Sequence, residues 1–84
     1  MPELTVEQIE RKLSEEVATI LSLPAAAVKP DVPLHTLGMD SMSFIEILVF
    51  IEKTFNLKLI ESGLTREDFQ TISALARRIS KERP

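Results

Sequence analysis

Residues 37–55 read LGMDSMSFIEILVFIEKTF, which is a helix start followed by a strongly apolar run. Asp40 is a favourable N-cap residue, because its carboxylate can accept a hydrogen bond from a backbone N–H of the first turn. Ser41 would then open the helix, with its hydroxyl at the positive end of the helix dipole. The segment predicts a helix from Ser41 to about Phe55, which Asn56 can close in the left-handed conformation.

This helix carries more apolar surface than a small core can cover. At 3.6 residues per turn, one stripe has the spacing of a core face and consists of Phe44, Ile47, Leu48, Ile51 and Phe55. A second stripe lies well round the helix and consists of Met42, Ile45 and Val49, beside Glu46, Glu52 and Lys53. Acidic residues are unfavourable inside a core, so we expect the second stripe to face a partner. The alternative is that Ile45 packs beneath the preceding loop.

The residues before this segment predict one helix and one long loop. Thr5 and Gln8 have the form of a capping box, and apolar residues then recur in helical steps at Val6, Ile9, Leu13, Val17 and Ile20. This helix should end near Leu21. Residues 22–40 contain four helix breakers, so we expect a loop, pinned to the core by Val28, Val32, Leu34 and Leu37. Within it, residues 24–27 predict a single helical turn with Pro24 in the first position.

The residues after it predict two more helices. Residues 57–59 alternate as an extended piece, and Ser62 and Gly63 form a turn. Thr65 is the expected N-cap of a short helix, and Thr71 that of the last helix. The last helix has a buried stripe at Ile72, Leu75, Ala76 and Ile79, and positive charge near its end at Arg77, Arg78 and Lys81.

Together these segments predict an all-α fold, a small four-helix bundle made of three main helices and one short helix. The 84 residues suffice for a single domain that spans residues 1–84. The long first loop suggests a crossover, so we expect the first two helices to run in a similar direction.

Composition excludes several classes of protein. The chain is 44% hydrophobic and 27% charged, and no apolar run reaches the ~18 residues of a membrane-spanning helix. Residues 1–4 lack the features of a signal peptide, so we expect a cytoplasmic protein. The absence of cysteine excludes disulfides, thiolate metal sites and a cysteine nucleophile. A net charge of −3 and the absence of Tyr and Trp argue against nucleic-acid binding.

The hexapeptide Leu37-Gly38-Met39-Asp40-Ser41-Met42 resembles the attachment motif of acyl carrier proteins, Leu-Gly-x-Asp-Ser-Leu, and the lengths and helix positions agree from Thr5 to Lys81. This resemblance implies that the Oγ of Ser41 is joined by a phosphodiester to 4′-phosphopantetheine, which a phosphopantetheinyl transferase delivers from coenzyme A. The thiol of the arm then holds acyl intermediates as thioesters and presents them to fatty-acid, polyketide or related biosynthetic enzymes. Such a protein is a carrier and not an enzyme, and we expect it to be a monomer.

The resemblance also assigns roles to neighbouring residues. Asp40 is both an N-cap and a candidate recognition residue for the transferase, Gly38 allows the backbone to come close, and Met42 follows the attachment site. The face turned to partner enzymes would comprise Met42, Ile45, Glu46, Val49 and Glu52. Ser43 and Lys53 stand where acidic residues are common in such carriers, and this favours a dedicated set of partners.

Several alternatives remain open from the sequence. A peptidyl carrier domain uses the same arm for aminoacyl groups, and a helical protein-interaction domain would leave Ser41 unmodified. A hydrolase would need His35, the only histidine, as the base for Ser41, but the chain has no Gly-x-Ser-x-Gly elbow. One histidine and no cysteine give little support to a metal site. We expect solvated charges at Glu15 with Glu16, Glu67 with Asp68, and Arg77 with Arg78.

Overall fold

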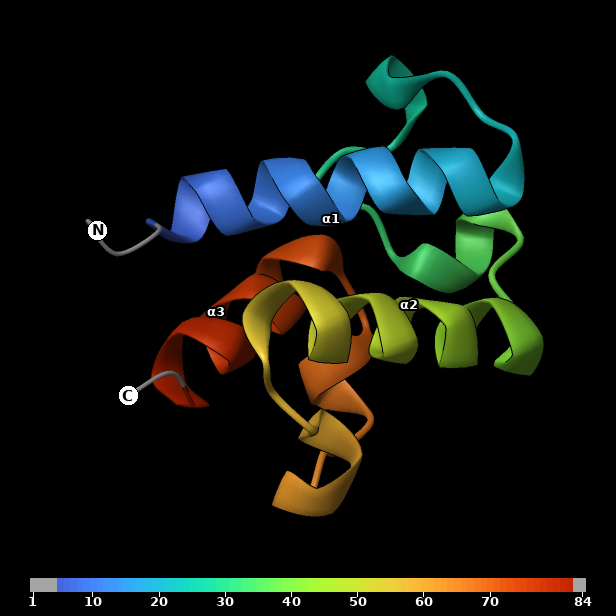
Figure 1. Cartoon of the computed structure of the whole chain (residues 1–84). Coiled ribbons are helices and arrows are strands. Elements are labelled where there is room, and N and C mark those ends of the chain that lie inside the picture. Colours follow the sequence, from blue (N-terminus) through green and yellow to red (C-terminus); the bar gives the residue numbers. More distant parts are fainter. Residues whose placement is uncertain (1–4, 83–84) are drawn as a thin grey trace.

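The computed structural model describes residues 5–82 and is all-α, as predicted. Its helices are α1 (Val6–Leu21), α2 (Ser41–Phe55) and α3 (Ile72–Glu82), shown in Figure 1. Four 3₁₀ turns lie between them: η1 (Ala25–Ala27), η2 (Leu34–Leu37), η3 (Leu59–Ser62) and η4 (Glu67–Phe69). Residues 5–82 contain no strand, only an isolated bridge between Pro33 and Thr71. Residues 1–4, on which the prediction of no signal peptide rests, lie outside the described part of the chain.

The starts and ends of the three α-helices follow local sequence signals. The Thr5 backbone N–H donates to Oε1 of Gln8 (2.9 Å), and the Gln8 N–H donates to Oγ1 of Thr5 (3.1 Å), which confirms the capping box. Asn56 closes α2 with φ 58°. The Ala74 N–H donates to Oγ1 of Thr71 (3.0 Å), so the predicted cap of α3 is confirmed.

The core lies between the three α-helices. Its fully buried members are Ile9, Leu13 and Val17 of α1, Ile47 and Ile51 of α2, and Ile72, Leu75, Ala76 and Ile79 of α3. Burial of each large aliphatic side chain stabilises the fold by roughly 1.5–3 kcal/mol. Leu48 and Phe55 pack against this core while partly exposed. The predicted stripes are therefore confirmed, except that Phe44 does not belong to the core.

The first loop is ordered, because its apolar residues and its backbone are tied to the core. Val28 and Leu34 are buried and Leu37 packs against the core, whereas the half-buried Val32 is not part of the core, contrary to the prediction. The Leu34 N–H donates to the carbonyl of Gln70 (2.9 Å), and the Ser73 N–H donates to that of Pro30 (2.9 Å). In η1 the proline is the N-cap and not the first helical residue, and η2 is a turn that the sequence did not indicate.

The predicted direction of the second helix is wrong. Figure 1 shows α1 and α2 running in opposite directions, with Ser41 at the end of the bundle where α1 finishes. The reason is the path of the loop, since burial of Val28 and Leu34 folds it back onto the core. The loop therefore returns to the end of the bundle that it left.

The second connection also differs from the prediction. Leu59 begins the 3₁₀ turn η3, so the extended piece stops at Lys58. The short helix is the single turn η4, and Thr65 does not cap it. Instead, Oδ2 of Asp68 accepts hydrogen bonds from the N–H and the Oγ1 of Thr65 (2.9 and 3.0 Å).

The expectation that Asp68 and Arg78 are only solvated charges is also wrong. Nη1 of Arg78 lies 2.6 Å from Oδ2 of Asp68, and Nε of Arg78 lies 3.4 Å from Oε2 of Glu82. Their side chains are 16% exposed for Arg78 and 25% for Asp68. This ion pair joins η4 to α3. Its two residues are ten positions apart in the sequence, so no local pattern indicates the contact.

Candidate functional site

The site is built around the first turn of α2. Oδ1 of Asp40 accepts a hydrogen bond from the Ser43 N–H at 2.9 Å, so the predicted N-cap is confirmed. This backbone hydrogen bond is the main reason why the pKa of Asp40 is lowered from its ordinary value of 3.8, and the Ser43 side chain adds to the effect. The carboxylate is therefore ionised at neutral pH, next to the positive end of the helix dipole.

Ser41 is exposed and is the first residue of α2, as predicted. Gly38 closes η2 just before it, with φ 95°. A Cβ on Gly38 would meet no protein atom within 4 Å, so the expected close approach of the backbone to the attached group stays a prediction. The glycine is needed for its left-handed conformation, in which an L side chain would be strained.

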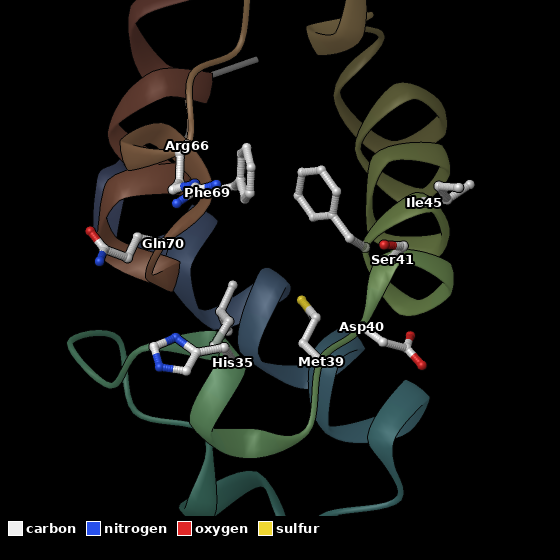
Figure 2. A pocket seen from close by; sticks show the side chains of 10 residues that line it. His35, Met39, Asp40, Ser41, Ile45, Arg66, Phe69 and Gln70 are labelled. Atoms are coloured by element: carbon white, nitrogen blue, oxygen red, sulfur yellow. The ribbon is translucent and has the colours of Figure 1, made fainter.

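A pocket of about 650 Å³ opens beside Ser41, between the start of α2, η2 and η4 (Figure 2). Its lining residues are Leu34, His35, Met39, Asp40, Ser41, Phe44, Ile45, Arg66, Phe69 and Gln70. Phe44 contacts Phe69 within this lining, with ring centroids 4.4 Å apart and an interplanar angle of 37°. Phe44 leaves the core stripe because, at this end of α2, it faces η4.

Arg66, Phe69 and Gln70 are site residues that the sequence did not indicate. They lie about thirty positions from Ser41 and reach the pocket only because η4 folds back against α2. An aromatic residue among polar neighbours, as Phe69 is in residues 65–71, was the one available signal.

The outer face of α2 is apolar and exposed. Met42, Ile45 and Val49 are 73%, 54% and 46% exposed, and the flanking Glu46, Glu52 and Lys53 are exposed as well. The alternative that Ile45 packs beneath the loop is therefore wrong. The exposure of this face is confirmed, while its contact with a partner stays a prediction.

The geometry of Ser41 and His35 does not support hydrolase activity. His35 and Ser41 line the same pocket, but no hydrogen bond joins them within residues 5–82. Oδ1 of Asp40 bonds to the Ser43 N–H, and the Asp40 carboxylate points away from His35 in Figure 2. A nucleophile, base and orienting carboxylate are thus not assembled.

The described residues contain neither a metal-binding cluster nor a membrane-spanning helix. No three His, Cys, Asp or Glu side chains of residues 5–82 are grouped closely enough to hold a metal ion. None of the helices in that range combines the length and the apolar character needed to cross a bilayer.

Comparisons with known proteins match most of the chain. The family model described as "Phosphopantetheine attachment site" matches residues 11–79. An acyl carrier protein of Onion yellows phytoplasma (strain OY-M) is 32% identical over 74 residues, which cover 87% of this chain and 95% of that protein. Polyketide-8 synthase acyl carrier protein 2 of Streptomyces avermitilis is 37% identical over 67 residues, 77% of each chain. Aminoacyl carrier protein 2 of Bradyrhizobium diazoefficiens is 29% identical over 77 residues, 89% of this chain and 86% of that one.

Proposed function

Because the chain belongs to the family of carrier proteins with a covalent 4′-phosphopantetheine group, we propose that Ser41 is the attachment residue. The observation that supports this most directly is the exposed hydroxyl of Ser41 at the start of α2, beside a pocket. As a member of this family, the protein is a carrier and not an enzyme.

The start of α2 suits a phosphodiester. Backbone N–H groups of a first helical turn and the positive end of the dipole both favour an anion. Asp40 uses its carboxylate to cap the helix, so Ser41 keeps its position at the surface. Gly38 supplies the left-handed turn that brings the chain into the helix. We assign Asp40 a second role as a contact of the transferase, which the cap does not prevent.

When bound, the prosthetic group supplies the thiol that holds the cargo as a thioester, since the chain itself has no cysteine. The protein's own task is to hold the attachment atom and to bring it to successive enzymes. Tethering keeps the cargo at a high effective concentration near whichever enzyme α2 engages.

The cargo in this proposal is an acyl group of fatty-acid, polyketide or related biosynthesis. Relatives named as acyl carrier proteins support it over 74 and 67 aligned residues. An aminoacyl cargo is the second candidate, because another relative is named an aminoacyl carrier protein. The intact mass of the loaded protein from its native cell would weigh the cargo and so separate the two.

The proposed docking face is the exposed outer face of α2, made of Met42, Ile45, Glu46, Val49 and Glu52. Its partners would be the phosphopantetheinyl transferase and enzymes that transfer or modify acyl groups. Lys53 and the uncharged Ser43 lower the negative charge of this face, which favours partners that contact its apolar side chains. We place this activity in a monomer of one domain, in the cytoplasm.

The attachment site is tested by intact mass. Incubation with coenzyme A and a transferase should add one phosphopantetheinyl group to the protein, and Ser41→Ala should abolish the gain. Ser80→Ala, at an exposed position of α3, is the matched control and should be modified like the parent. Far-UV circular dichroism should show the same helical content in all three. A modified Ser41→Ala variant would disprove the assignment, and an unmodified interaction domain would show no gain in the parent.

A further inference from the structure

The two rims of the pocket beside Ser41 differ in chemistry. Ser41 and Ile45 stand on the α2 side (Figure 2), and the rings of Phe44 and Phe69, with centroids 4.4 Å apart, also line the pocket. The opposite rim carries His35 of η2, together with Arg66 and Gln70 beside η4. A group tethered at Ser41 would therefore cross an aromatic surface and meet polar side chains at its far end.

Arg66 gives this far rim an uncompensated positive charge. Asp68, two residues away, is paired with Arg78 at 2.6 Å and also bonds to Thr65. Within residues 5–82, none of the carboxylates forms an ion pair with Arg66. Among the described residues of the lining, only Asp40 carries a carboxylate; it accepts from the Ser43 N–H and points away from Phe69 in Figure 2. The charge of the far rim therefore favours an anion.

The pocket also has a limited depth. Among its lining residues only Leu34 is a member of the buried core, so the pocket ends at the core surface. The rings of Phe44 and Phe69, whose centroids are 4.4 Å apart, both line the pocket. A volume of about 650 Å³ is that of a small-ligand site.

From these observations we propose that the pocket holds the free end of a short cargo, and that the preferred cargo is an acyl group with a second carboxylate at that end, bound by Arg66. This inference rests on attachment at Ser41. An aminoacyl group is disfavoured, because α-amino groups have pKa values of ~7.7–8.0 and are mostly positive at neutral pH. Such a group would meet the like charge of Arg66.

The anion that Arg66 attracts has two possible sources on a loaded carrier. One is the carboxylate of the cargo, and the other is the phosphodiester at Ser41, which is present without any cargo. The experiment must therefore compare loaded and unloaded protein.

The test uses modified protein that carries glutaryl, pentanoyl or 4-(trimethylammonio)butyryl thioesters, which end in an anion, a methyl group and a fixed cation. The half-life of each thioester in neutral hydroxylamine is measured, and NMR records the ring signals of Phe69. Arg66→Gln removes the charge, and Arg11→Gln, at an exposed position of α1, is the matched control. Ratios of half-lives between variants cancel the intrinsic reactivity of each thioester.

We expect Arg66→Gln to shorten the half-life of the glutaryl thioester roughly two- to fivefold, the effect of a solvent-accessible ion pair. The pentanoyl half-life and all values for Arg11→Gln should not change, and 1 M salt should abolish the glutaryl effect in the parent. The glutaryl group should also shift the Phe69 signals relative to unloaded protein.

Equal half-lives of the glutaryl thioester in the parent and in Arg66→Gln would overturn the inference. It would also be overturned if Arg66→Gln shifted the Phe69 signals of unloaded protein and no cargo shifted them further, since Arg66 would then serve the phosphodiester. A parent protein that coenzyme A and the transferase fail to modify would instead contradict the proposed function, before any cargo is compared.

Discussion

The inner and outer faces of α2 differ sharply although they share one helix. Ile47 and Ile51 on the inner face have no exposed surface, whereas Met42 on the outer face is 73% exposed. The inner face packs among α1 and α3, and the outer face has no cover within residues 5–82. One helix thus separates the side chains that stabilise the core from those that stay exposed to solvent, although they lie only a few positions apart. Substitutions on the two faces should therefore give different losses.

The largest effect is expected on the inner face. Ile51→Ala removes a fully buried side chain and should lower the free energy of unfolding by about 2–5 kcal/mol. Val49→Ala, two residues away on the outer face, should change it by less than about 0.5 kcal/mol. Urea denaturation followed by circular dichroism measures both. Similar losses at the two positions would show that the outer face is covered in solution.

A substitution on the outer face is expected to have an intermediate effect, which concerns modification of the protein by the transferase. Met42→Ala should raise the KM of the transferase for the protein about fivefold, the effect of losing ~1 kcal/mol of contact energy. Its urea midpoint should stay that of the parent, because the side chain makes little contact with the core. Arg11→Ala, on exposed α1 surface, is the control for nonspecific effects. An unchanged KM for Met42→Ala would place docking elsewhere.

The smallest effect is that of pH on the stability of the fold. The apolar side chains of the inner face do not titrate, so they should not contribute to this dependence. The Thr65 N–H and then Arg78 lower the pKa of Asp68 from its ordinary value of 3.8, and the Ser43 N–H does the same for Asp40. A carboxyl whose pKa is lower in the folded state contributes stability above pH 3.8, and this contribution is lost as the pH falls through the folded-state pKa. The protein should thus lose some thermal stability on acidification from pH 5 to pH 2.

Asp68→Asn should reduce this acid sensitivity, because the amide cannot titrate. Thermal melts followed by circular dichroism at both pH values measure the difference in Tm. Asp31→Asn, at an exposed loop position, is the control and should behave as the parent. An identical pH dependence in Asp68→Asn and the parent would mean that neither the hydrogen bonds from Thr65 nor the ion pair with Arg78 stabilises the fold in solution.

The sequence predicted those features that depend on near neighbours. The capping box of Thr5, the cap at Asp40 and the exposure of Met42, Ile45 and Val49 all follow from spacings of a few residues. Membership of the carrier family agrees with the motif around Ser41.

The features that the sequence did not predict depend on distant contacts. Helical periodicity assigns Phe44 to the core because it indicates which residues share a face, but not what that face contacts. The pairing of Asp68 with Arg78 and the placement of Arg66 in the pocket require η4 to lie against other elements. The direction of α2 likewise depends on where residues 22–40 touch the core.

The hydrogen bond from the Leu34 N–H to the carbonyl of Gln70 joins two walls of the pocket directly. The third wall, α2, meets η4 through the rings of Phe44 and Phe69, and no hydrogen bond connects these two elements within residues 5–82. Ring contacts tolerate sliding, whereas a backbone hydrogen bond is directional. The walls formed by η2 and η4 are thus held in register by a directional hydrogen bond, whereas the wall that carries Ser41 meets η4 through an aromatic contact.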